Sequence, residues 1–184
     1  MSRHGTPPES PEQNASPELH PLLKAPAPTP PRPTIRVAVV DDHPAVRDAV
    51  ARAVGVQPDM ALAGVAGSAA EAFALVREAD PDVAVVDISL GDAHGLDLVQ
   101  NLRAERPDLA VVMFSMYDEA VYAERALRAG AKGYVRKSEP TSAVTEAIRA
   151  AAAGEIYLAR RAASRILARV AEGDGGAADQ GPAR

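Results

Sequence analysis

Short apolar runs alternate with amphipathic stretches along the chain from residue 34 onward. Five runs, rich in small or β-branched residues, predict buried strands: Ile35–Val40, Ala61–Ala66, Val83–Val86, Ala110–Phe114 and Gly133–Val135. Apolar residues at helical spacing predict the helices that follow them: Pro44–Val54, Ser68–Ala79, Gly95–Glu105, Glu119–Ala129 and Thr141–Ala153. Because parallel strands need crossover connections, this strict alternation predicts a doubly wound α/β domain with helices on both faces of a parallel sheet.

Residues that begin or end helices occur where the periodicity requires them. Pro44 suits a first helical position, and Ser68 with Glu71 three residues later predicts a capping box. Gly130 and Gly154 suit helix ends. The local signals and the periodicity therefore predict the same elements.

The outer parts of the chain differ in composition from the α/β segment. Residues 1–33 are crowded with Pro, Ser and Glu and include "PAPTPPRP". They predict a disordered Pro-rich tail that serves as a spacer, with an adaptor ligand as the alternative. We place one domain at residues 34–154, a C-terminal extension with an additional helix at 155–171, and a second disordered tail at 172–184.

Composition restricts the class of protein further. The 184 residues contain no cysteine, which excludes disulfides and thiolate chemistry and fits a reducing compartment. No apolar run reaches the roughly 18 residues of a membrane span, and the N-terminal region lacks a secretory signal core. A net charge of -5 provides no general basic field. We therefore expect a cytoplasmic protein that contacts neither a membrane nor nucleic acid directly.

Polar side chains follow several of the predicted strands. Asp41 and Asp42 come directly after the first strand, and two such charges about 4 Å apart at an effective dielectric of about 20 repel by about 4 kcal/mol. Asp87 follows the third strand, Ser115 the fourth, and Lys137 lies just past the fifth. In an open α/β sheet, ligands bind outside the carboxyl ends of the strands, so we expect these side chains to meet.

Carboxylate, hydroxyl and ammonium groups in one crevice favour a hard cation and a phosphoryl group. Mg²⁺ prefers carboxylate and carbonyl oxygens and commonly joins them to phosphate, so it would offset the repulsion between Asp41 and Asp42. Lys137 would pair with the phosphoryl group and Ser115 would donate a hydrogen bond to it. The remaining carboxylate, Asp87, is the expected nucleophile.

Four stretches carry a resemblance to a known family: "VAVVDDHPAVRDAV", "PDVAVVDISLGDAHGLDLV", "VVMFSMYDEAVYAERALRAGAKGYVRKSEP" and "EAIRAAAAGEIYL". From about Ile35 to Val170, the chain resembles the receiver domain of bacterial two-component response regulators. The resemblance is strongest to the NarL/FixJ/LuxR-type subclass, whose members usually carry a downstream helix-turn-helix. It implies a flavodoxin-like (βα)5 fold with sheet order 2-1-3-4-5.

The resemblance also implies ligands and a reaction. A sensor histidine kinase or a histidine phosphotransfer protein would present a phosphohistidine, which Asp87 attacks in line. Asp42, Asp87 and the backbone carbonyl of Ser89 would hold Mg²⁺ directly, while Asp41 would act mainly through water. The metal and Lys137 would neutralise the transferred charge. Such a domain is a phosphoacceptor switch that assists only its own phosphorylation and dephosphorylation, and is not an enzyme with a separate substrate.

A conformational switch is implied by the same resemblance. Ser115 would move toward the phosphoryl group, and Tyr134 would turn inward behind it. This would reshape the face made by Glu119–Ala129 and the following strand. The expected output is a protein-interaction face, with homodimer formation on phosphorylation and regulation of transcription as further expectations. Only a short tail follows Val170, so we expect either a stand-alone receiver or a transcription factor without its second domain.

Several residues have alternative roles. Asp41 and Asp42 have the alternative of capping the helix that begins at Pro44. His43 and His94 have no second imidazole at ligand spacing, so we expect ordinary polar roles for them.

The last helix carries an arginine stripe. Arg161, Arg165 and Arg169 align on one face, where a solvated stripe is expected and an anionic contact is the alternative.

Three other functions are alternatives to the phosphoacceptor switch. A magnesium phosphohydrolase with an aspartyl intermediate usually carries a second acid two residues after the nucleophile, where this chain has Ser89. A nucleotide-binding module lacks both common glycine-rich phosphate motifs. A receiver that is never phosphorylated is the third alternative.

Overall fold

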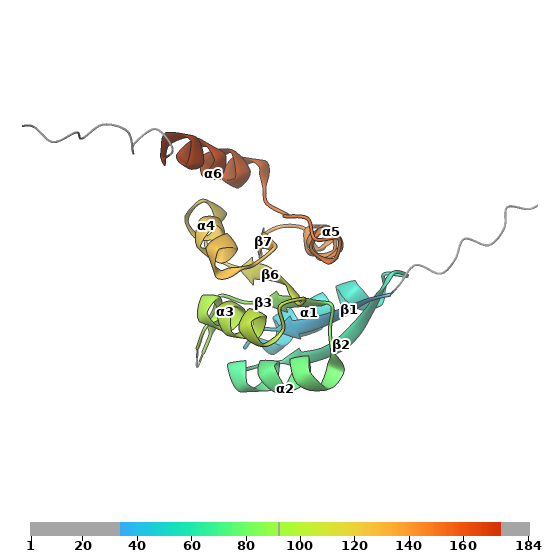
Figure 1. Cartoon of the computed structure of the whole chain (residues 1–184). Helices are drawn as coiled ribbons and strands as arrows, with labels where there is room; N and C mark the ends of the chain where they lie inside the picture. The colour runs from blue at the N-terminus through green and yellow to red at the C-terminus, as the bar shows by residue number, and fades with distance from the viewer. Residues whose placement is uncertain (1–33, 92, 174–184) are drawn as a thin grey trace, which may run out of the picture. The chain divides into compact units, whose positions relative to one another are not determined.

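A computed structural model describes residues 34–91 and 93–173 of the chain (Figure 1). The elements in this part follow the predicted alternation of strand and helix. They are β1 (Ile35–Val40), α1 (Pro44–Gly55), β2 (Met60–Ala66), α2 (Ala69–Ala79), β3 (Val83–Val86), β4 (Ser89–Leu90), β5 (Ala93–His94), α3 (Gly95–Glu105), β6 (Ala110–Ser115), α4 (Glu119–Ala129), β7 (Gly133–Arg136), α5 (Thr141–Ala152) and α6 (Arg160–Gly173).

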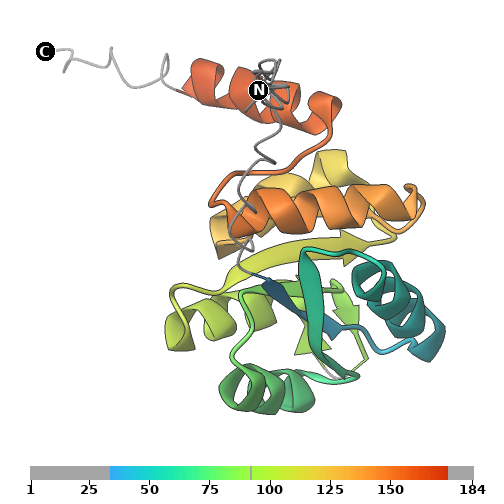
Figure 2. The same cartoon turned by 90° about the vertical axis from the view of Figure 1, so that its right-hand side faces the viewer.

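Five of the strands form one parallel sheet in the order β2-β1-β3-β6-β7. Counted along the chain without the two-residue strands β4 and β5, this is the predicted order 2-1-3-4-5. Val37 pairs with Val83 and Val83 pairs with Ala110, so the carboxyl ends of β1, β3 and β6 lie side by side. The flavodoxin-like, doubly wound fold is confirmed (Figure 2).

Side chains of each strand alternate between the two faces of the sheet and form two cores. One core joins Val39 of β1 to Val50 of α1 and Ile148 of α5. The other joins the neighbouring Val40 to side chains from α2, α3 and α4, among them Ala126. Full burial of an aliphatic side chain contributes about 1.5–3 kcal/mol, so a firmly packed sheet supports the strand ends.

The predicted capping box of α2 is present, with one change. Ser68 is the N-cap, and its hydroxyl accepts a hydrogen bond from the backbone N–H of Glu71 at 3.3 Å. The Glu71 carboxylate reaches back to the N–H of Gly67, at 2.7 Å, one residue before the N-cap. Gly130 and Gly154 have φ values of 101° and 81° and end their helices in the left-handed conformation, as predicted.

The start of α1 tests the alternative that Asp41 and Asp42 cap this helix. α1 begins at Pro44, but its N-cap is His43, whose side chain makes no capping hydrogen bond. Asp41 Oδ1 accepts a hydrogen bond from the backbone N–H of His43 at 2.9 Å. The alternative that Asp41 and Asp42 cap α1 is therefore wrong.

The C-terminal helix α6 ends at Gly173, two residues past the predicted boundary at residue 171. The predicted tails at 1–33 and, beyond Gly173, at 174–184 lie outside the described residues. Within the described part of the chain, every helix is too short or too polar to cross a membrane.

Candidate functional site

The carboxyl ends of β1 and β3 bring an acidic cluster together. Asp41, Asp42 and His43 follow β1 directly, and Asp87 follows β3. One potential ligand atom from each of these four residues lies within 4.8 Å of the other three. The sheet register explains this proximity, because Val40 at the end of β1 lies opposite the last residue of β3.

Lys137, which directly follows β7, contacts two aspartates of the cluster. Its Nζ lies 2.6 Å from Asp41 Oδ2 and 2.7 Å from Asp87 Oδ2, and only 8% of its side chain is exposed. The backbone N–H of Lys137 donates to the carbonyl of Ser115 at 2.8 Å, which extends the pairing of β7 with β6 by one residue. The predicted meeting of two strand-end aspartates with the lysine is therefore present.

Two carboxylate oxygens in the cluster have no hydrogen bond of acceptable geometry. They are Asp41 Oδ2 and Asp42 Oδ1, both buried. Each still lies 2.6 Å from a nitrogen, of Lys137 and of His43 respectively, so these contacts are close ion-pair contacts without hydrogen-bond alignment. Buried carboxylate oxygens without a well-aligned hydrogen bond are costly, and an additional cation would lower that cost. The oxygen-rich donor set therefore fits a hard divalent cation such as Mg²⁺.

The aspartates differ in exposure. The Asp41 side chain is 3% exposed and is held by the His43 N–H, whereas the Asp42 side chain is 31% exposed. Asp42 can therefore reach an ion that keeps part of its water shell.

Burial and charge shift the pKa values of Asp87 and Lys137. Burial raises the pKa of Asp87, and the hydrogen bond and charge of Lys137 offset this rise only in part. Burial alone would lower the pKa of Lys137, but its hydrogen bond to Asp87 and its close ion-pair contact with Asp41 outweigh burial and raise this pKa. Lys137 therefore carries its positive charge at neutral pH, and an additional positive charge near Asp87 would favour the ionised form of its carboxyl.

The loop after Asp87 contains a glycine that sequence reasoning did not single out for the site. Gly95 donates its N–H to the carbonyl of Ile88 at 2.7 Å, beside the short hairpin of β4 and β5. A Cβ at Gly95 would lie 2.0 Å from the carbonyl oxygen of Asp87. Only glycine lets α3 begin this close to the backbone of Asp87. The sequence predicted Gly95 only as the first residue of a helix.

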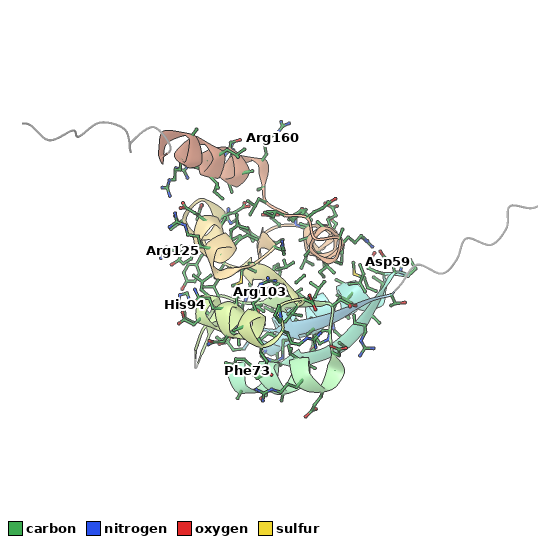
Figure 3. All side chains as sticks on the ribbon, viewed as in Figure 1. Asp59, Phe73, His94, Arg103, Arg125 and Arg160 are labelled. Carbon is green, nitrogen blue, oxygen red and sulfur yellow. The ribbon has the colours of Figure 1, made fainter. Side chains whose placement is uncertain are left out.

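The two histidines near the site differ. His94, labelled in Figure 3, is the N-cap of α3, and its Nδ1 accepts a hydrogen bond from the N–H of Leu96 at 3.3 Å. This is the ordinary polar role that was expected. His43 instead lies inside the acidic cluster, with Nδ1 2.6 Å from Asp42 Oδ1. Sequence reasoning placed His43 only near the site.

Ser115 and Tyr134 both hold the loop between β6 and α4. Ser115 Oγ accepts a hydrogen bond from the N–H of Tyr117 at 3.2 Å, and the Tyr134 hydroxyl donates to the carbonyl of Tyr117 at 3.1 Å. Tyr134 is buried. Its side chain already lies inside the domain in this structure, where the Tyr117 carbonyl accepts its hydroxyl proton. The switch roles of Ser115 and Tyr134 stay predictions.

Tyr117 also contacts the loop that follows Asp87. Its hydroxyl lies 3.3 Å from Ser89 Oγ, which donates to it, and its ring stacks on Tyr122 of α4 with centroids 4.8 Å apart. The side chains of Ser89 and Tyr117 thus join the β3–α3 loop to the β6–α4 loop.

Tyr134 is expected to titrate later than an ordinary tyrosine. Burial raises its pKa from 10.0 to about 12, with a smaller opposing effect from the Ser115 hydrogen bond. The unfolded chain loses this proton first, so stability is full below pH 10 and falls by about 2–3 kcal/mol as the pH rises to about 12. Urea unfolding across this range should show a shallower loss in Tyr134→Phe. An identical loss in both proteins would contradict the assignment.

The comparisons with known proteins agree with this geometry. Residues 37–149 match the response regulator receiver domain family, so the chain belongs to that family of two-component signalling switches. It is 38% identical over 138 residues to the DNA-binding transcriptional activator DevR/DosR of Mycobacterium tuberculosis, covering 74% of this chain and 63% of that protein. The chain thus spans less than two thirds of that relative's length.

Two solved structures support the same family. The two-component response regulator of the LuxR family from Aurantimonas sp. SI85-9A1 matches with a TM-score of 0.69 and 33% identity, over 75% of this chain and 99% of that one. The response regulator domain of Thermotoga maritima CheB matches with a TM-score of 0.60 and 29% identity, over 65% of this chain and 97% of that one. The predicted resemblance to receiver domains is confirmed.

Proposed function

We propose that the chain is a phosphoacceptor switch in which Asp87 receives a phosphoryl group with the help of Mg²⁺. The observation that supports this most strongly is the clustering of Asp41, Asp42, Asp87 and Lys137 at the carboxyl ends of β1, β3 and β7. Neither a structural ion pair nor a capping role requires so many buried charges in one place. A phosphoryl group and a divalent cation would satisfy them together.

In the proposed reaction, an Asp87 carboxylate oxygen attacks the phosphorus of a phosphohistidine in line. A P–O bond to Asp87 forms as the P–N bond breaks, and the leaving imidazole nitrogen keeps the electron pair. Lys137, already 2.7 Å from Asp87 Oδ2, neutralises charge on the transferred group. Ser115 lies one strand away and would donate its hydroxyl to a phosphoryl oxygen. The chain thereby assists only its own phosphorylation and dephosphorylation.

The metal site would use the acidic cluster. Asp42, Asp87 and the backbone carbonyl of Ser89 would hold Mg²⁺ directly, and Asp41 would act mainly through water. When bound, Mg²⁺ would neutralise phosphoryl charge as a Lewis acid. The partly exposed position of Asp42 supports this assignment, and so do the Asp41 and Asp42 oxygens that accept no well-aligned hydrogen bond.

The partners follow from this chemistry. The phosphoryl donor would be a sensor histidine kinase or a histidine phosphotransfer protein in the cytoplasm, and a homodimer on phosphorylation is a further proposal. We assign the receiver to residues 34–154, and the extension with its helix to 155–171. Regulation of transcription is proposed from the relative described as a DNA-binding activator. Direct nucleic-acid contact by this chain is not proposed, since its net charge is -5.

Magnesium dependence tests the proposal. Incubated with acetyl phosphate, the protein should gain one phosphoryl group by intact mass with Mg²⁺ and none with a chelator. Asp42→Asn loses a metal ligand, so half-maximal phosphorylation should need an Mg²⁺ concentration about 10–100-fold higher, the usual loss of metal affinity when a residue around a metal site is replaced. Asp48→Asn, an exposed acid on α1, is the matched control.

Two results would overturn the proposal. An equal mass gain in chelator would contradict the metal assignment. Sustained turnover of a phosphate ester would favour the phosphohydrolase alternative.

A further inference from the structure

Helices α4 and α6 pack against each other on the side of α4 away from the sheet (Figures 1 and 2). Ala162 of α6 is buried, and Leu158 and Ile166 pack on the core that contains Ala126 of α4. A pocket of about 350 Å³, within the usual range of small-molecule sites, lies between the two helices. This arginine pocket is lined by Val121, Glu124, Arg125, Arg128, Arg165 and Arg169.

Helical spacing brings the four arginines to the arginine pocket. Arg125 and Arg128 are three residues apart on α4, and Arg165 and Arg169 are four residues apart on α6. Residues at these spacings lie on the same face of a helix. All four side chains are exposed, and the packing of α4 on α6 turns both pairs toward one space. Arg161, the third member of the predicted arginine stripe, is not among the described residues that line it.

Glu124 supplies the negative charge in the lining of the arginine pocket. Its carboxylate oxygens lie 2.7 Å from Arg128 Nη2 and 2.7 Å from Arg169 Nη1. The predicted arginine stripe therefore makes an anionic contact within the chain, at Arg169. Four arginines and one glutamate still give the lining a formal charge of +3, whereas the whole chain carries -5. The sign of the charge is thus reversed locally.

The other two arginines have no acidic partner in the part of the chain that the structure describes. The Arg165 side chain is exposed, and the Arg125 guanidinium, labelled in Figure 3, lies 5.7 Å from the centre of the Tyr122 ring. Like charges around one pocket repel, so an anion between them would be stabilised. Guanidinium groups bind phosphate oxygens two at a time, and this geometry favours phosphate as the anion.

We propose that the arginine pocket binds a small ligand with two or three linked phosphate groups, such as a nucleoside triphosphate or inorganic triphosphate. Such a ligand carries about three to four negative charges, which match the formal charge of +3. A nucleic acid fits less well, because it spreads its charges along a strand and the chain as a whole is acidic. The arginine pocket shares no residue with the acidic cluster around Asp87, so the inference goes beyond the proposed function and does not depend on it.

Isothermal titration calorimetry of the full chain, in chelator, tests the proposal with inorganic triphosphate and with a nucleoside triphosphate. Both should bind at one site per chain. Affinity should fall as salt is added, because the pairing is electrostatic and the side chains are exposed. Orthophosphate should bind far more weakly, because one phosphate group engages fewer of the four arginines.

Two matched variants locate the site. Arg165→Gln removes an unpaired charge from the arginine pocket and should lower triphosphate affinity by about 10–100-fold, the usual effect of losing hydrogen bonds to a charged group. Arg161→Gln removes the same charge from the same stripe, but Arg161 lines a neighbouring pocket with Glu119 and Glu139, so affinity should stay unchanged. Both arginines are exposed, so both variants should melt like the wild type without ligand.

The outcomes separate the possible ligands. Equal affinities for the two triphosphates would identify the phosphate chain as the recognised group, and tighter binding of the nucleoside triphosphate would add the nucleoside. Citrate, of similar charge, binding as tightly as triphosphate would overturn the assignment to phosphate. Single-stranded DNA binding more tightly, with the same loss in Arg165→Gln, would overturn the small ligand in favour of nucleic acid. Absence of saturable binding, or an equal loss in Arg161→Gln, would overturn the site itself.

Discussion

Replacing Lys137 with methionine is expected to slow phosphoryl transfer to Asp87 by about 10²–10³-fold, the usual effect of removing one group that stabilises developing charge. Lys137 Nζ lies within 2.7 Å of carboxylate oxygens of both Asp41 and Asp87. Methionine has a similar length but no charge, so the transferred group would lose its protein cation. The rate of mass gain with acetyl phosphate and saturating Mg²⁺ measures the effect.

The same substitution is expected to lower the free energy of unfolding by about 3–5 kcal/mol in chelator, because it leaves buried carboxylates unpaired. Bound Mg²⁺ should recover part of this loss, since a ligand that binds only the folded state stabilises it. Lys132→Met is the control, at the opposite end of β7 from Lys137. An unchanged transfer rate, or an equal loss of stability in Lys132→Met, would contradict the role of Lys137.

Asp87→Asn is expected to abolish phosphorylation and yet to stabilise the metal-free protein by about 1–2 kcal/mol, as site substitutions that relieve functional strain commonly do. Burial, and to a smaller extent the charge of Asp41, raises the pKa of Asp87, so folding disfavours the ionised carboxyl. Asparagine keeps the shape and removes the charge. Urea unfolding in chelator measures the gain.

With Mg²⁺ bound, the wild-type protein should become more stable than Asp87→Asn, the reverse of the order expected in chelator. The wild-type site would gain binding free energy from the ion, whereas Asp87→Asn lacks one ligand and would gain less. Asp108→Asn, an exposed acid in the loop before β6, should be unaffected in both conditions. Lower stability of Asp87→Asn in chelator would show that Asp87 is a structural ion-pair partner of Lys137 and would refute this account of its charge.

The periodicity of the sequence was sufficient to predict the main elements, because long apolar runs and helix-end residues such as Pro44 and Ser68 are local signals. The meeting of Asp41, Asp87 and Lys137 was predictable once the strands were parallel neighbours, because their carboxyl ends share one edge. The sheet order itself came from the family resemblance.

Other features depend on contacts between distant segments and have weak local signals. β4 and β5 have two residues each, too few to show a period of two. The inward position of Tyr134 depends on the carbonyl of Tyr117, and the pairing of Tyr157 with β7 depends on where the chain returns after α5. The close approach of Gly95 to Asp87 is likewise a tertiary constraint.

Borohydride reduction of the phosphorylated protein tests most directly whether Asp87 is the phosphoacceptor. Reduction converts an aspartyl phosphate to homoserine, and peptide mass spectrometry then locates the modified residue. After incubation with acetyl phosphate and Mg²⁺, homoserine is expected at residue 87 and at no other aspartate. Homoserine at residue 41 or 42, or a phosphoryl mass gain that resists borohydride, would contradict the assignment of Asp87.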